Sequence, residues 1–169
     1  MIHAVRLAVE NLMLNAPSPN GILASASPLT FVPPAPATSL DLIADAIAQL
    51  ESQGYTVDAI VLSAQDAFAM RMQKTTLGTY LWADPDASVG SNTIWDTRVI
   101  ISPSMPPSFF VVGGFGQGCL YFDRQRATVD VALERRLHPN LVCLTCECSG
   151  VLAIPVPAAL VKGTFATGL

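Results

Sequence analysis

Charged residues are scarce in this sequence. Asp, Glu, Lys and Arg together make up 13% of the 169 residues, where a typical soluble domain carries about 25%. Apolar residues make up 51% of the chain. A monomer needs charge to cover its surface, so the shortage indicates that part of the surface is buried against partners. The length is that of one domain, or of one domain with a small appendage.

The sequence also has no basic stripe and no uninterrupted hydrophobic run. Its nine basic residues are scattered and the net charge is −4, which disfavours specific binding to DNA or RNA. The most apolar window, residues 141–161, contains Glu147, Pro155 and Pro157, so we expect no membrane span there. We find no convincing targeting segment, and therefore expect the four cysteines to be reduced thiols.

Residues that carry catalysis are few. The two histidines are His3 and His138, and no serine lies in a G-x-S-x-G turn. Cys143, Cys146 and Cys148 form C-x-x-C-x-C, but on a strand Cys146 and Cys148 share one face while Cys143 takes the other. Three such thiols cannot converge on a tetrahedral ion. The sequence therefore predicts no catalytic residue, no metal and no cofactor.

A glycine-rich segment at residues 113–118 resembles a phosphate-binding loop. It lacks both the G-x-G-x-x-G spacing and a G-K-[ST] ending. The residues after it predict a strand, whereas phosphate binding needs the start of a helix. We predict a glycine-rich hairpin here. Trp82 and Trp95 are predicted to be packing anchors.

Helices are predicted early in the chain and strands late, which indicates an α+β fold. Residues 1–14, 39–53 and 64–73 show helical patterns, with Thr38 or Ser39 capping the second helix, Gly54 ending it, and Ser63 with Asp66 capping the third. Two connectors are predicted, the first with six prolines, at residues 15–37 and 77–92. Predicted strands, mostly antiparallel, lie at residues 59–62, 98–102, 109–112, 119–122, 127–133, 141–148 and 159–165.

Five motifs follow one another between residues 40 and 165. Trp95 with residues 99–100 is similar to a W-G-x-P-V-V segment, although Asp96 replaces the glycine and Arg98 the proline. In this order and spacing, the motifs resemble those of the tailed-phage major capsid family, which has the Hong Kong 97-like fold. The other four motifs are residues 42–47 with 59–63, 112–115, 122–131 and 161–165.

The resemblance implies two domains and a structural role. Residues 38–120 would form the axial domain, and residues 1–37 with 121–169 a partial peripheral domain. The chain would then be a subunit of an icosahedral shell that assembles with its copies, in rings of five or six, through axial-domain contacts. It would be a virion component, assembled in the bacterial host cytoplasm, near packaged DNA without binding it specifically, and with no membrane partner.

The resemblance also implies a departure from the family pattern. Family members carry an N-terminal arm, an extended loop and a long spine helix before the region matched here, so we expect a truncated remnant, or a piece of a subunit, that cannot close a complete shell alone. Some members cross-link a lysine to an asparagine with the help of a glutamate. Asn140 and Glu147 stand at matching positions, although we favour the plainer interpretation, a strand-edge amide and a half-exposed acid.

Three other functions stay open at this point. An encapsulin-like compartment shares the fold but encloses protein cargo. A small α+β hydrolase would need a serine, His138 and an aspartate to converge in space, with a deep pocket around His138. A binding module would use the apolar surface on a host partner.

Overall fold

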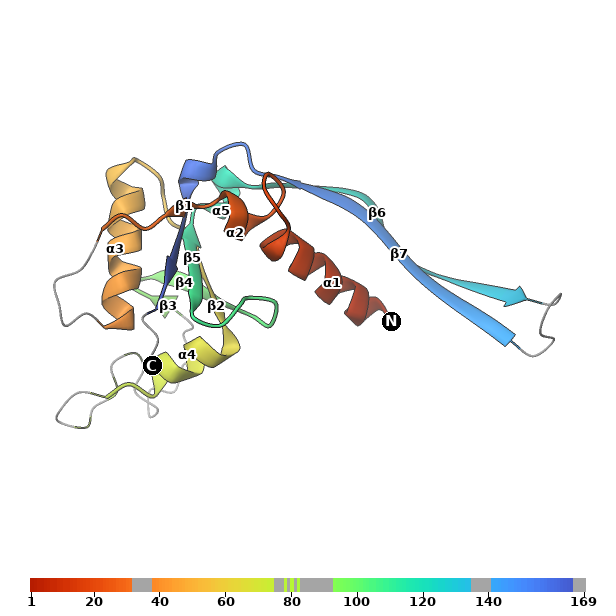
Figure 1. Cartoon of the computed structure of the whole chain (residues 1–169), viewed down its shortest axis with the longest axis horizontal. Coiled ribbons are helices and arrows are strands. Elements are labelled where there is room, and N and C mark those ends of the chain that lie inside the picture. The colour runs from red at the N-terminus through yellow and green to blue at the C-terminus, as the bar shows by residue number, and fades with distance from the viewer. Residues whose placement is uncertain are drawn as a thin grey trace.

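A computed structural model describes residues 1–31, 38–74, 78, 80, 82, 93–134 and 141–165. Figure 1 shows a two-stranded ribbon projecting from a body built around a larger sheet, with the first helix alongside the ribbon. The helices are α1 (Ile2–Asn15), α2 (Ile22–Ser25), α3 (Ser39–Ser52), α4 (Ala64–Arg71), α5 (Phe115–Gly118) and the 3-10 turn η1 (Pro157–Ala159). The strands are β1 (Ser27–Pro28), β2 (Ala59–Ser63), β3 (Thr93–Ile94), β4 (Thr97–Ser102), β5 (Phe109–Gly113), β6 (Leu120–Glu134), β7 (Leu141–Ala153) and β8 (Leu160–Thr164).

The body is a six-stranded mixed sheet in the order β1-β8-β5-β2-β4-β3, and the ribbon is β6 paired with β7. The mostly antiparallel sheet predicted from the sequence is only partly confirmed, because β2 runs parallel to β4 and β1 parallel to β8. The two strands predicted at 119–122 and 127–133 are one long strand, β6. Its register against β7 shifts between Asp123 and Thr128, which interrupts the alternation that sequence patterns rely on.

The central strands bury both faces. On one face, Ile60 and Leu62 of β2 join Ile43 and Leu50 of α3 and the Phe110 ring in a single core, all fully buried. On the other face, Val61 packs with a second cluster that includes Leu14 of α1 and Ile22 of α2. Because a strand alternates its side chains, β2 holds the α3 layer and the α1–α2 layer together.

The α3 helix begins and ends where its sequence predicts. Thr38 Oγ1 accepts a hydrogen bond from the Asp41 N–H at 3.3 Å, and Asp41 Oδ2 accepts one from the Thr38 N–H at 2.8 Å. These reciprocal bonds form a capping box, which satisfies free N–H groups of the first turn. Gly54, with φ of +83°, follows the last turn. Ser63 Oγ caps α4 in the same way by accepting from the Asp66 N–H at 3.0 Å.

Two local predictions are wrong. Residues 15–37 are not all connector, because they include α2 and β1. Strand β1 lies at the edge of the sheet, where Pro28 is tolerated. Its pairing with β8 is extended by a hydrogen bond from the Leu29 N–H to Lys162 O at 2.9 Å. Residues 113–118 are not a hairpin. The Asp58 carboxylate accepts bonds from the N–H groups of Phe115 and Gly116, at 2.9 and 2.8 Å, and so holds α5 at the turn between the two sheets. Most of the predicted loop at 77–92 lies outside the described residues.

Candidate assembly surface

The β6–β7 ribbon has one apolar face and one polar face over its outer half. Pairing sets Val129 opposite Cys146 and Val131 opposite Leu144, so these side chains share a face. Thr128 opposite Glu147, and Asp130 opposite Thr145, define the other face. The apolar side chains remain exposed: Val129 by 42%, Val131 by 62%, Val142 by 54% and Leu144 by 48%.

Helix α1 covers only the inner half of the apolar face. One side of the helix faces Tyr121 and Cys148 of the ribbon. This side carries Val5, Val9 and Met13. Two open hollows of about 640 and 590 Å³ flank this contact, and Leu14 alone of the α1 side chains is buried. Figure 1 shows the strands continuing well past the N-terminus, where α1 no longer accompanies them.

The α1 helix is fixed to the body by polar contacts at its other end. Glu10 accepts a short hydrogen bond from the Ser102 hydroxyl. Asn15 Nδ2 donates to Ser104 O at 2.8 Å. These bonds join α1 to the end of β4, so the helix keeps its direction along the ribbon although its apolar contact is loose.

The strand edges of the ribbon are also open. Within the described part of the chain, no third strand pairs with β6 or β7. An unpaired edge exposes N–H and C=O groups that another chain can pair with, and natural proteins usually protect such edges with lysine or proline. The 13 residues of β7 include neither, and Glu147 is their one charge. An isolated two-stranded ribbon is marginally stable, and the open edges and exposed apolar face make this surface a candidate for contact with another chain.

The predicted site residues divide between the described and undescribed parts of the chain. Glu147 is exposed on the polar face of the ribbon, while Asn140 and His138 lie outside the described residues. Cys143 pairs with Ala132 and Cys146 with Val129, which puts these two thiols on opposite faces, as predicted. Among the residues that the structure describes, no three His, Cys, Asp or Glu side chains form a metal-holding group.

The prediction for the two tryptophans is half right. Trp82 is anchored, because its Nε1–H donates to Thr93 O at 3.1 Å and the Arg71 guanidinium lies 5.1 Å from its ring centre. Trp95 is 58% exposed at the turn between β3 and β4. Sequence patterns cannot show such exposure, because it depends on which strands surround the turn.

Among the residues that the structure describes, one thiol and one carboxyl have clearly shifted pKa values. Burial, and secondarily the charge of Asp58, raise the pKa of Cys119 at the end of α5. The hydrogen bonds from the backbone and the side chain of Thr38 lower the pKa of Asp41. Asp41 belongs to the capping box of α3, and Cys119 packs against the second core cluster. No helix in the described part of the chain is long and apolar enough to cross a membrane.

The chain belongs to the phage capsid family, which matches residues 1–165. Over 133 residues it is 34% identical to the major capsid protein of Enterobacteria phage HK97, and the match covers 78% of this chain and 34% of that protein. The chain thus spans about a third of the length of that curated relative.

Solved structures confirm the Hong Kong 97-like fold. The capsid of an empty GTA particle is similar with a TM-score of 0.70 at 20% identity, over 98% of this chain and 65% of that one. Gordonia phage Cozz gives 0.72 at 10% identity, over 98% and 61%. A virus-like particle from Pyrococcus furiosus gives 0.67 at 12% identity, over 94% and 63%.

Proposed function

We propose that this chain is a structural subunit, or part of one, of an icosahedral phage shell, and that it works by binding copies of itself. The observation that carries the proposal is the uncovered apolar face of the ribbon, with Val129, Val131, Val142 and Leu144 exposed together. Exposed apolar patches of this kind mark interaction sites. A shell subunit buries such a face against its neighbours.

The low charge of the chain supports the same role. With 13% charged residues and a net charge of −4, the surface suits burial between copies better than binding to nucleic acid. Packaged DNA would lie near such a shell without specific contacts. The proposed subunit is a virion component assembled in the host cytoplasm, and it needs neither a catalytic centre nor a cofactor.

The proposed domain division follows the family. Residues 38–120 form the axial domain, which meets its copies at the symmetry axes, and residues 1–37 with 121–169 form part of the peripheral domain. Two strands from the peripheral segments, β1 and β8, pair within the six-stranded sheet. The ribbon is then the projecting part of the peripheral domain.

The proposal is tested by a pair of neighbouring substitutions in β7. Leu144→Lys puts a charge on the apolar face, and Thr145→Lys puts the same charge on the polar face, opposite Asp130. We expect Leu144→Lys to reduce the solution mass measured by light scattering, and Thr145→Lys to leave it unchanged. Equal masses for both variants and the unmodified chain would contradict the use of this face in assembly.

A further inference from the structure

The β3–β4 turn holds an aromatic side chain out in solvent. Pairing of Ile94 with Thr97 leaves Trp95 and Asp96 as a two-residue turn, with φ of +45° and +61°. A left-handed backbone is unfavourable for a residue other than glycine. Trp95 is nevertheless kept in this conformation and is 58% exposed. Tryptophan is the residue type most enriched among side chains that dominate binding between proteins.

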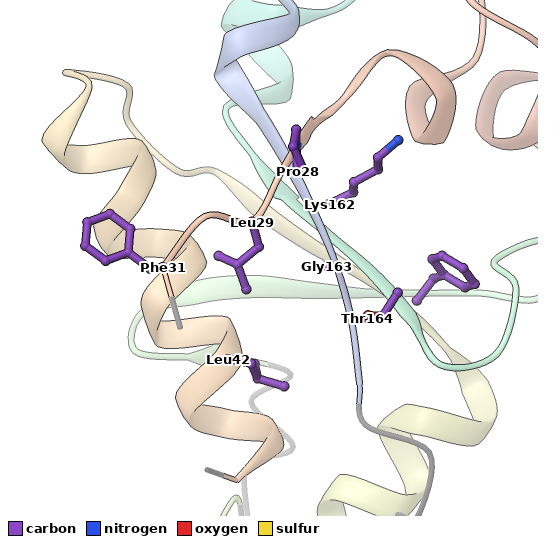
Figure 2. Close-up of a pocket in the computed structure, with 8 residues that line it drawn as sticks. Pro28, Leu29, Phe31, Leu42, Lys162, Gly163 and Thr164 are labelled. Atoms are coloured by element: carbon purple, nitrogen blue, oxygen red, sulfur yellow. The ribbon is translucent and has the colours of Figure 1, made fainter. Parts of the chain in front are cut away.

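A groove of about 340 Å³ lies at the other end of the same sheet. Its lining is mainly apolar and comes from the β1–β8 edge, from α3 and from the start of β5. Figure 2 shows Leu29, Leu42 and Thr164 around the β8 backbone at Gly163. The groove is lined by Leu29, Phe31, Leu42, Phe109, Lys162 and Thr164.

The two features occupy opposite edges of the sheet, because its order runs from β1 to β3. A contact between them cannot be satisfied within one molecule. Between copies it is a head-to-tail contact, in which each copy offers its turn to one neighbour and its groove to the next. Head-to-tail contacts close into rings when the rotation between copies permits.

Charges around the two features are complementary. Arg98, exposed on β4, follows the turn. The α3 helix beside the groove carries Asp41, Asp45 and Glu51 and no basic residue. One oxygen of Asp45 is buried without a hydrogen-bond partner among the described residues.

In the second pair of charges, the acid belongs to the turn and the base belongs to the groove. Asp96 stands next to Trp95 in the turn, and Lys162 lines the groove. The Lys162 ammonium donates to Leu23 O at 2.7 Å, which leaves two of its three donors for a carboxylate. Asp96 thus has an opposite charge in the groove lining, and Arg98 has opposite charges on the helix that contributes Leu42 to that lining.

We propose that Trp95 of one copy inserts into the groove between β8 and α3 of the next copy, with Arg98 directed at the acids of α3. This inference rests on the proposed shell function and names a second contact, separate from the ribbon. The turn supplies the anchor and the groove supplies an apolar site that excludes water around it. The partner is a second copy of this chain.

Each of two substitutions removes a different side of the contact. Trp95→Ala removes the anchor and keeps the groove, whereas Thr164→Arg fills the groove from an exposed position and keeps the anchor. Both are made in the Leu144→Lys chain, so that association through the ribbon is suppressed. The measurement is the mass by light scattering up to millimolar concentration. We expect Leu144→Lys alone to associate, and each double variant to be monomeric.

Mixing the two double variants distinguishes a head-to-tail contact from any other. One intact anchor then meets one intact groove, so an equimolar mixture forms a dimer and nothing larger. The matched controls are Phe68→Ala, which removes an equally exposed aromatic side chain, and Gln53→Arg, which adds the same charge after α3. Both controls are expected to keep the mass of the Leu144→Lys chain, and thermal unfolding checks that every variant is folded.

Each other outcome overturns the inference in a recognisable way. If the unmodified chain associates and the Leu144→Lys chain is monomeric, the groove contact is wrong and the shell function stands. The same conclusion follows if the Leu144→Lys chain associates and its mass does not change on adding Trp95→Ala or Thr164→Arg. A mixture that stays monomeric also overturns the head-to-tail arrangement. If the unmodified chain is itself monomeric at millimolar concentration, the proposed function fails together with the inference.

Discussion

The backbone N–H of Ser108 donates a 2.8 Å hydrogen bond to Oδ2 of Asp66, 42 residues earlier in the chain. The same carboxylate accepts a bond from the Ser63 hydroxyl at 2.8 Å, and it is buried. Ser108 O in turn accepts from the Phe165 N–H at 2.9 Å. One side chain therefore joins the start of α4 to the loop before β5 and, through that loop, to the end of β8.

Replacing Asp66 by alanine is expected to lower the free energy of unfolding by about 2–3 kcal/mol, since the buried hydroxyl of Ser63 and the partly buried N–H of Ser108 lose their acceptor. Asp66→Asn keeps an acceptor oxygen and should cost less. Urea denaturation of the three proteins measures both differences. An alanine variant as stable as the unmodified chain would show that this carboxylate does not hold the loop.

The capping box of α3 predicts a specific dependence on pH. Hydrogen bonds to Thr38 lower the folded-state pKa of Asp41, so this carboxylate stabilises the fold above its ordinary pKa of about 4. The contribution is lost as the pH falls through the lower folded-state value. Asp41→Asn should therefore reduce stability at pH 7 by about 0.3–1 kcal/mol, because Asp41 is exposed and its charge is screened, and the difference should vanish in strong acid. A pH-independent difference in urea midpoints would contradict this account.

Gly163 is predicted to reject any side chain. A Cβ added there would collide with the ring of Phe110, which is fully buried and lies 4.8 Å from the Phe165 ring centre. Gly163→Ala should destabilise the fold by about 1–3 kcal/mol through overpacking. Gly116→Ala is the control, because its Cβ would approach no atom closer than 3.4 Å. Calorimetry should show a lower unfolding temperature for Gly163→Ala than for the control.

The cysteines are predicted to differ in reactivity. Burial and the charge of Asp58 raise the pKa of Cys119, so less thiolate is present at pH 8 and alkylation is slowed. Cys143 is exposed on the ribbon and should react first. Asp58→Asn removes the charge and should speed alkylation of Cys119. Peptide mass spectrometry over time measures these rates, and faster labelling of Cys119 than of Cys143 would refute the prediction.

The local parts of the fold could be predicted because their signals lie within a few residues. The α3 helix is an example: Thr38 and Asp41 cap its start, and Gly54 follows its last turn. The α5 turn could not be predicted, since its stabilising carboxylate, Asp58, is 57 residues away from Phe115 in the sequence. Interactions at that separation leave no pattern in the neighbouring residues.

The candidate surface was only partly predictable for the same reason. Low charge indicated buried contacts without saying where they lie. The alternation of residues 128–131 and 142–147 predicts a strand with one apolar and one polar face. The apolar face is exposed because α1 covers only half of it, and the sequence does not show how far α1 reaches. The exposure of Trp95 likewise depends on the packing around its turn, and no sequence pattern reports it.

Whether copies of this chain bind one another is decided by the solution mass of the unmodified protein. Light scattering over a range of concentrations, with electron micrographs of the same samples, gives the answer. We expect masses that are multiples of 17.9 kDa, up to rings of five or six copies or larger shells. A monomer at every concentration, up to millimolar, would contradict it.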